Sequence, residues 1–146
     1  MHELLRRTAS LLAAQLAARD IGVRLALDAR DPHVEGDEEQ MTQVMLNLLT
    51  NALQVVAPGG RLEVGSGDES ETLAIDIADD GPGIAPHERA HVFDAFFFKR
   101  EGGIGLGLAI VQQIVQAHGG TIEAAASESA GALFHIRVPR TRREPT

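Results

Sequence analysis

A strand pattern that ends in a polar, glycine-rich turn constrains this chain more than any other feature. Leu73, Ile75 and Ile77 alternate with smaller or polar residues, which is the period-two pattern of a strand with one buried face. The turn that follows reads Asp79-Asp80-Gly81-Pro82-Gly83-Ile84. Its carboxylate and its two glycines suit a flat ligand, because glycine lets such a group approach the backbone. An ordinary bend is the alternative, since Asp-Gly and Pro-Gly are common turn dipeptides.

Length and charge exclude several classes of protein. The 146 residues are enough for one domain with a real core, and 44% of them are hydrophobic. Thirteen Lys and Arg against 21 Asp and Glu give a net charge of −8, which argues against a nucleic-acid-binding surface and against contact with anionic lipid. There are no cysteines, so disulfides and thiolate metal sites are excluded. Without a membrane span or a secretory signal profile, the chain is expected to be cytoplasmic.

Helical and strand periodicities occur in a mixed order along the chain. Asp37 is suited to cap the second helix, and Gln40 is placed to complete a capping box. Gly22, Pro58 and Gly119 are expected to stop the three longer helices. Helices are therefore expected over about residues 1–20, 38–57, 86–93 and 108–118, and strands over about 23–28, 61–65, 72–77, 121–126 and 133–138.

This order predicts an α+β fold, a two-layer sandwich. The sheet should be mixed but largely antiparallel, with about five strands and about three helices on one face. A loop over 66–70 would join two strands as a hairpin. We expect one domain over residues 1–139 and a disordered tail over 140–146.

Two asparagines on the second helix could carry chemistry. Asn47 and Asn51 are four residues apart, so they share a helix face roughly opposite the apolar stripe of that helix. The stripe consists of Met41, Val44, Met45, Leu48, Leu49, Ala52, Leu53 and Val56. They could form a solvated polar face. Alternatively, Asn51 could offer its amide oxygen to Mg²⁺, with phosphate oxygens and waters completing the octahedron. The pair alone does not decide between these interpretations.

A glycine-rich segment leads directly into the helix expected from residue 108. Gly103, Gly105 and Gly107 would place free backbone N–H groups next to the positive end of the helix dipole, which suits a phosphate. A flexible hinge is the alternative. Lys99 and Arg100 favour phosphate, because an acidic domain needs nearby cations to hold a polyphosphate.

The sequence from His87 to His91 satisfies the H-E-x-x-H zinc pattern. We interpret this match as coincidence, because a hydrolytic zinc needs a third protein ligand and a supported helix. The other histidines are expected at the surface or at helix ends; they are His2, His33, His118 and His135.

Three segments, taken in order, closely resemble the nucleotide-binding boxes of sensor histidine kinases. They are Asn47–Ala52, Asp79–Ile84 and Gly103–Leu108, and Phe93–Phe97 resembles the phenylalanine box of that family. The resemblance covers nearly the whole chain and implies a mixed sheet under helices that binds ATP and Mg²⁺. It implies that Asp79 accepts a hydrogen bond from the adenine amine, that Asn51 binds Mg²⁺ and that Asn47 lies near the phosphates. The nucleotide-binding residues implied in this way are Asn47, Asn51, Asp79, Gly81, Gly83, Ile84, Lys99, Arg100, Gly103, Gly105, Leu106 and Gly107.

Adenine should be preferred over guanine for a reason independent of the resemblance. An ionised carboxylate can only accept hydrogen bonds, and guanine presents a carbonyl where adenine presents a donor. The chain also departs from the family pattern. In the segment that would form a lid over ATP, Phe98, Lys99 and Arg100 replace the frequent Thr-Thr-Lys, and Ile104 replaces a threonine or serine. The stretch from Gly131 lacks a threonine that commonly helps to hold adenine.

The residue at position 47 bears on the reaction. In relatives that hydrolyse ATP, a glutamate generally stands four residues before the magnesium asparagine and activates water. Asn47 has no useful basicity, which favours a protein histidine kinase over an ATPase and makes Asn47 the candidate catalytic residue. The acceptor histidine would lie on a separate dimerisation domain, in cis or in trans, with a response regulator downstream. The alternative is a nucleotide-sensing module, or an anti-sigma-type serine kinase, of the same fold.

Overall fold

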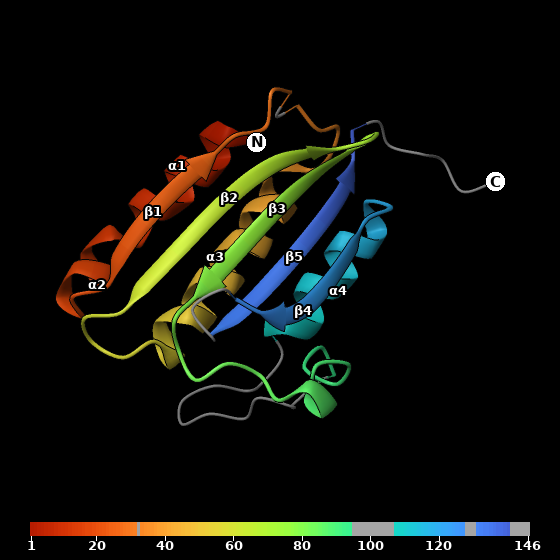
Figure 1. Cartoon of the computed structure of the whole chain (residues 1–146). Helices are drawn as coiled ribbons and strands as arrows, with labels where there is room; N and C mark the ends of the chain where they lie inside the picture. Colours follow the sequence, from red (N-terminus) through yellow and green to blue (C-terminus); the bar gives the residue numbers. More distant parts are fainter. Residues whose placement is uncertain (32, 95–106, 128–130, 141–146) are drawn as a thin grey trace.

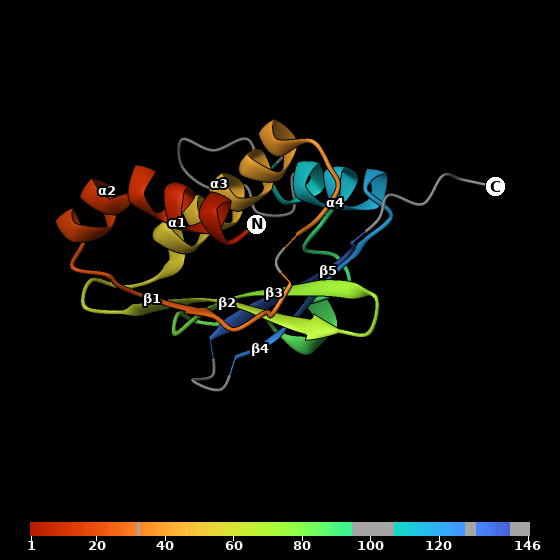
Figure 2. The same ribbon diagram turned by 90° about the horizontal axis from the view of Figure 1, so that it is seen from above.

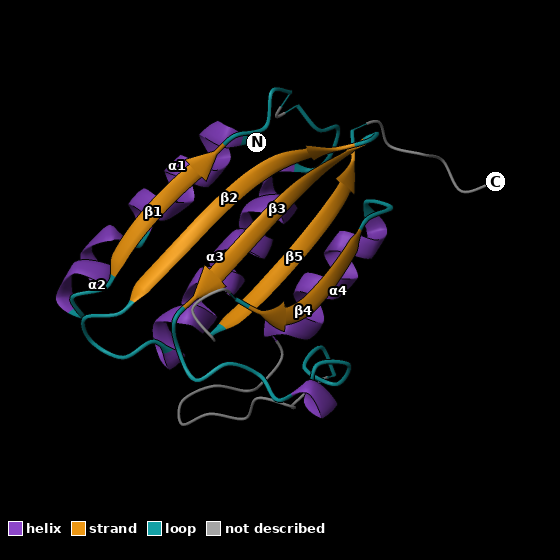
Figure 3. Ribbon diagram, viewed as in Figure 1, coloured by secondary structure: helices purple, strands orange, loops and turns teal. Residues whose placement is uncertain are grey.

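The computed structural model describes residues 1–31, 33–94, 107–127 and 131–140. They form one five-stranded sheet with the longer helices behind it (Figure 1). After a turn of 90°, the helices and the strands separate into two layers (Figure 2). The expected two-layer α+β sandwich is therefore confirmed. In chain order the elements are α1 (His2–Leu11), α2 (Ala13–Ala18), β1 (Gly22–Leu27), α3 (Glu38–Val55), β2 (Arg61–Glu69), β3 (Thr72–Asp79), the 3₁₀ helix η1 (Pro86–Glu88), α4 (Gly107–Ala117), β4 (Thr121–Ala126) and β5 (Ala132–Pro139) (Figure 3).

The strands lie in the order β1-β2-β3-β5-β4. β1 pairs with β2 in parallel, and the other pairings are antiparallel, as a mixed, largely antiparallel sheet requires. The β2–β3 hairpin is confirmed, but the loop expected over 66–70 is wrong. Pairing with β3 continues to Glu69 opposite Thr72, which leaves only Ser70 and Glu71 to turn the chain. Ser70 adopts a positive φ of 54° there.

The core lies between the helix layer and the inner face of the sheet. Leu73 and Ile75 of β3 are fully buried, and each such side chain contributes roughly 1.5–3 kcal/mol. Asp37 caps α3 as expected, because its Oδ1 accepts from the Gln40 N–H at 3.1 Å. The apolar stripe predicted for α3 is also confirmed; its buried residues are Met41, Val44, Met45, Leu48, Leu49, Ala52 and Leu53.

The first helix differs from the expectation of one helix over about twenty residues. It breaks at Leu12, with φ −101° and ψ 3°, into α1 and α2. Within α1, the Thr8 hydroxyl donates to Leu4 O at 2.7 Å, a contact that bends helices. The chain then reverses at Asp20, whose φ is 55°, so Gly22 opens β1 instead of stopping the helix.

Of the two helices expected in the second half of the chain, one is shorter than expected and one ends where expected. Pro86 opens only the three-residue η1, followed by turns, so the helix expected to continue to Phe93 is wrong. α4 does end before Gly119, which adopts a φ of 78° and donates its N–H to Gln116 O at 2.9 Å. Glycine is needed here, because other residues rarely adopt that φ.

Arg140, which we predicted to begin the tail, is anchored to the domain. Its guanidinium donates to Thr72 O at 2.9 Å and to Asp31 O at 3.2 Å, and it pairs with Asp68. Residues 141–146, the rest of the expected tail, lie outside the described residues. Within the described ranges, no helix is both long and apolar enough to cross a bilayer.

Candidate functional site

Asp79 ends β3 at the turn that the sequence marks as a ligand site. Its side chain is almost fully buried, and Oδ1 accepts from Gly81 N at 2.9 Å and from Ala132 N at 3.1 Å. The carboxylate is therefore held by its own turn and by the first residue of β5. Gly131 has no room for a side chain, because a Cβ there would lie 2.0 Å from Asp79 O. Close packing of the backbones thus fixes the orientation of Asp79.

A narrow pocket of about 40 Å³ opens beside Asp79. The pocket brings together four predicted residues from two separate segments of the sequence: Asn51 from α3, and Asp79, Gly83 and Ile84 from the end of β3 and its turn. It also adds others. Pro82 and Phe134 fall within stretches that the sequence singles out but were not predicted as site residues, and Val55 was not predicted at all. The lining residues are Asn51, Val55, Asp79, Pro82, Gly83, Ile84, Ala132 and Phe134.

The missed residues left partial traces in the sequence. Val55 follows Asn51 by four residues, so it lies on the same face of α3. Phe134 occupies an inward position of β5, and its ring meets Phe93 edge-on with 6.1 Å between ring centroids. Phe93, part of the segment resembling a phenylalanine box, is therefore placed behind the pocket. Phe96 and Phe97 lie outside the described residues.

Asn47 and Asn51 play different structural roles on the same face of α3. Asn51 lines the pocket with Asp79. The Asn47 Nδ2 group donates to Gly107 O at 3.2 Å, and its Oδ1 accepts from Gln43 Nε2 at 2.7 Å. Neither asparagine therefore contacts only solvent, as the alternative of a solvated polar face would require. Asn47 instead joins α3 to the first residue of α4.

The predicted phosphate-binding lid falls mostly outside the described part of the chain. Lys99, Arg100, Gly103, Gly105 and Leu106 lie outside the described residues. Gly107 is described, and it is the exposed first residue of α4. The phosphate cradle expected at this helix start remains a prediction.

The segment with the H-E-x-x-H pattern does not form a continuous helix. His87 and Glu88 belong to η1, whereas His91 lies in the following turns and pairs with Asp94 at 3.2 Å. Among the described residues, no group of three or more His, Asp or Glu side chains is arranged to hold a metal ion.

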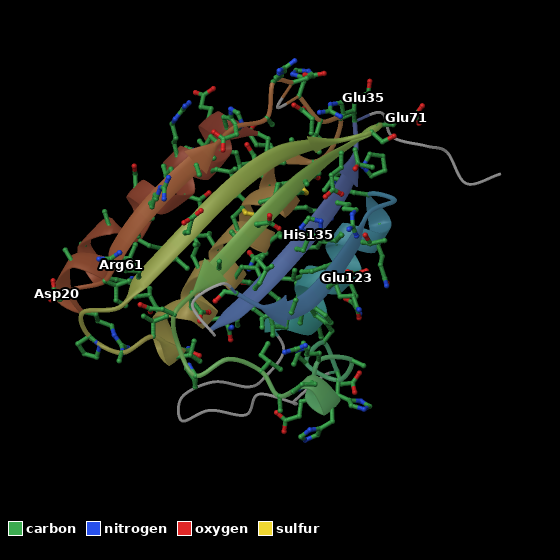
Figure 4. The ribbon with its side chains drawn as sticks, viewed as in Figure 1. Asp20, Glu35, Arg61, Glu71, Glu123 and His135 are labelled. Atoms are coloured by element: carbon green, nitrogen blue, oxygen red, sulfur yellow. The ribbon has the colours of Figure 1, made fainter. Side chains whose placement is uncertain are left out.

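Of the other histidines, His118 lies at a helix end, as expected, whereas His135 lies neither at a helix end nor on an exposed surface. His118 directly follows α4 and is only 7% exposed. His135 lies within β5 on the sheet face opposite the helices, near Glu123 of β4 (Figure 4). Its Nδ1 contacts the Asp76 carboxylate, and its Nε2 lies 3.4 Å from a Glu69 oxygen. The pairing of acids with His135 across the strands explains why this position is largely covered.

An ion pair with shifted pKa values lies on this same open face. A side-chain hydrogen bond from Arg137, at 2.6 Å, holds the pKa of Glu69 below its ordinary value and raises the pKa of Arg137. A hollow of about 630 Å³ also lies on this face, reaching Asp79 and Asp80. It is larger than the pocket at Asn51 but contains neither asparagine. The smaller pocket is the candidate site, because it joins a magnesium-type donor with the buried carboxylate.

Comparison with known proteins shows which family the chain is similar to. Residues 36–142 match the profile of the family described as histidine kinase-, DNA gyrase B-, and HSP90-like ATPase. The sensor histidine kinase ZraS of Escherichia coli (strain K12) is 33% identical over 147 residues, covering 99% of this chain and 32% of ZraS. The chain thus spans about a third of the length of that relative.

Solved structures show the same similarity. The catalytic domain of histidine kinase ThkA aligns with a TM-score of 0.90 at 29% identity, covering 97% of this chain and 93% of that domain. ThkA in complex with the response regulator protein TrrA aligns with a TM-score of 0.87 at 27% identity, over 99% of this chain and 42% of that one. The mycobacterial sensor histidine kinase MprB is 34% identical, with a TM-score of 0.85, and the alignment covers 98% of this chain and 96% of MprB.

Proposed function

This chain belongs to the histidine kinase-, DNA gyrase B- and HSP90-like ATPase family, and we propose that it is the catalytic ATP-binding domain of a two-component histidine kinase. In this proposal it transfers the γ-phosphate of ATP to a histidine on a separate dimerisation domain. The observation that carries the proposal is the convergence of Asn51 from α3 and Asp79 from β3 on one pocket. Sensor histidine kinases that align over almost the whole chain support it.

Asp79 would select the base. Its Oδ1 is held by two backbone N–H groups, which fixes the carboxylate plane relative to the pocket. A fixed acceptor favours the exocyclic amine of adenine over the carbonyl of guanine. Gly83 and Ile84, which also line the pocket, would contact the ring, and Gly81 would hold Asp79 in place.

Asn51 fits the chemistry of a magnesium site. Mg²⁺ takes oxygen ligands and keeps several waters and phosphate oxygens, so a single amide oxygen from the protein is sufficient. Asn51 would supply that oxygen, and the ion would neutralise charge on the phosphates. We assign phosphate binding to Asn47, Lys99, Arg100, Gly103, Gly105, Leu106 and Gly107.

The Asn47 side chain favours transfer of the γ-phosphate to a protein nucleophile over its hydrolysis by water. Both polar atoms of the Asn47 amide already have partners, and an amide is not a base that could activate water. In the transfer step, a histidine nitrogen forms a bond to the γ-phosphorus while the bond to the β–γ bridging oxygen breaks and ADP leaves. The domain supplies positioning and charge neutralisation for this step.

The partners follow from the same proposal. The acceptor histidine would belong to a dimerisation domain, in the same longer protein or in another chain, because the relative ZraS is about three times as long as this chain. A response regulator would receive the phosphoryl group afterwards, and ThkA forms a complex with its regulator TrrA. We place these steps in the cytoplasm.

The test is phosphotransfer from labelled ATP to purified histidine-bearing dimerisation domains. We expect acid-labile phosphate on an acceptor with the wild-type chain and Mg²⁺, and its loss with Asn51→Ala. Asp80→Asn serves as a matched control, because Asp80 holds Arg61 N and does not line the pocket. ATP binding without transfer to any acceptor, or acid-stable phosphate on serine, would contradict the proposal.

A further inference from the structure

His118 is a buried histidine with a partner on each ring nitrogen. Nδ1 lies 2.8 Å from Ile114 O, in the last turns of α4. Nε2 lies 3.1 Å from the backbone N of Asp37, which precedes α3. A carbonyl only accepts and a backbone N–H only donates, so these partners require hydrogen on Nδ1 and a lone pair on Nε2. The geometry therefore assigns one neutral tautomer to His118.

The contact with Asp37 replaces half of a capping box. Asp37 caps α3 through its carboxylate, but its own N–H bonds to His118 and not to the Gln40 side chain. Gly36 makes room for the ring, because a Cβ there would lie 2.7 Å from His118 Cδ2 and 2.9 Å from Nε2. Gly36 and His118 thus form one packed joint at the start of α3.

A second contact ties the same two helices near the pocket. α3 and α4 pack side by side in the helix layer (Figure 2). Asn47 in the middle of α3 donates to Gly107 O at the start of α4. His118, just beyond the other end of α4, accepts a hydrogen bond from the N–H of Asp37, the N-cap residue of α3. The two contacts together fix the position of α3 along α4.

We propose that His118, in its Nδ1–H tautomer, is a positioning residue for the nucleotide site. By holding the start of α3 against the end of α4, it sets where Asn47 and Asn51 lie relative to the first residues of α4. The assignment of a nucleotide to this site rests on the proposed function. The position of the two asparagines does not, because it can be measured without ATP.

The tautomer is the first test. Long-range ¹H–¹⁵N spectra of the histidine-labelled chain at about pH 7 should show a protonated Nδ1 and a pyridine-type Nε2 for His118. The signals are assigned by their loss in His118→Gln. A proton on Nε2 at this pH would overturn the proposal.

Two substitutions at His118 separate positioning from simple packing. His118→Gln keeps an acceptor where Nε2 lies, whereas His118→Leu fills the space without one. We expect His118→Leu to weaken Mg-ATP binding about three- to tenfold and His118→Gln to stay near wild type. Equal affinity in wild type and His118→Leu, or equal weakening in both variants, would contradict the role.

Gly36→Ala approaches the same joint from the other side. Its Cβ would displace the ring, so we expect weakening similar to that of His118→Leu and little further loss when the two changes are combined. Gly67→Ala, where no heavy atom lies within 4 Å of an added Cβ, is the matched control. Full additivity of Gly36→Ala and His118→Leu would count against a shared joint.

A readout without nucleotide separates this inference from the proposed function. In the nucleotide-free chain, the side-chain amide signals of Asn47 and Asn51 should shift in His118→Leu and remain in place in His118→Gln. Unmoved signals in His118→Leu would overturn the positioning role even if wild type binds ATP. Shifted signals would support it even if wild type binds none, and the proposed function alone would then fail.

Discussion

At the scale of single residues, Asp79 combines a structural role with the proposed recognition role. One of its oxygens, Oδ1, accepts from Gly81 N and Ala132 N, and both bonds are within 3.1 Å. An asparagine at this position could keep those two bonds through its carbonyl oxygen. Its amide nitrogen would then present a donor where the carboxylate presents an acceptor. Recognition can therefore be separated from folding by one substitution.

We predict that Asp79→Asn binds ATP about 10- to 100-fold more weakly, because a charge-assisted hydrogen bond is replaced by two opposed donors. Calorimetric titration with Mg-ATP measures the affinity, and thermal unfolding checks the fold. Asp80→Asn removes the same charge from the adjacent residue and should bind like wild type. Unchanged ATP affinity in Asp79→Asn would remove Asp79 from the base site.

The sequence predicts part of this site and omits part, for a physical reason. Asn51, Asp79, Gly83 and Ile84 belong to motifs whose chemistry is visible in short stretches, and they do meet in one pocket. Phe134 reaches the same pocket only because β5 pairs with β3, opposite Ile77. A pairing between distant strands leaves no local trace at the residue itself. The functional roles of all these residues remain predictions.

At the scale of elements, the close approach of β5 to the end of β3 is the critical contact. We predict that Gly131→Ala destabilises the fold by about 1–3 kcal/mol and weakens ATP binding, because its Cβ would overlap Asp79 O. Gly67→Ala should instead stabilise by about 0.5–1 kcal/mol, since it lies within a strand with open space around it. Urea unfolding of both variants measures the difference. A stable Gly131→Ala chain with full ATP affinity would show that this approach is not required.

A pH effect is expected from the ion pair between β2 and β5. The hydrogen bond from Arg137 lowers the pKa of Glu69 from its ordinary 4.5 in the folded state. The stabilisation is therefore complete above the unfolded pKa and is lost as pH falls through the lower folded pKa. A double-mutant cycle with Glu69→Gln and Arg137→Gln should give a larger coupling energy at about pH 7 than near pH 3. An equal coupling energy at both pH values would contradict it.

The boundaries of elements show which local patterns are reliable. The cap at Asp37, the apolar stripe of α3 and the stop at Gly119 follow from residue type and are confirmed. The break at Leu12 was not predicted, because the apolar periodicity of the first helix continues through residue 12 to Leu16. The longer β2 was missed for a different reason: residues 66–69 are weak strand formers held by pairing with β3.

At the scale of the whole molecule, nucleotide binding should stabilise the folded chain. A ligand that binds only the folded state contributes about 2.7 kcal/mol at 100 times its Kd. We therefore predict a clear rise in melting temperature with Mg-ATP and a smaller one with Mg-GTP at the same concentration, measured by calorimetry. Asp79→Asn serves as the control and should lose most of the ATP effect. Equal stabilisation by both nucleotides would contradict adenine recognition.

The sequence predicts the layers of the fold but not the order of its strands. Apolar alternation identifies each strand, and the helix faces indicate one covered side. The final strand, however, pairs with both β3 and β4, and β1 pairs in parallel with β2. Such choices depend on tertiary packing between distant segments and not on local propensity.

The insertion of the final strand between β3 and β4 has a consequence for biosynthesis. A nascent chain that has not yet released β5 from the ribosome lacks the strand that joins β4 to β3, and Asp79 lacks the Ala132 N–H that holds its carboxylate. Nucleotide therefore cannot assist the early stages of folding during translation. The β3 edge stays open to other strands until β5 has emerged, so the hazard of wrong strand pairing lasts until residues 132–139 are available.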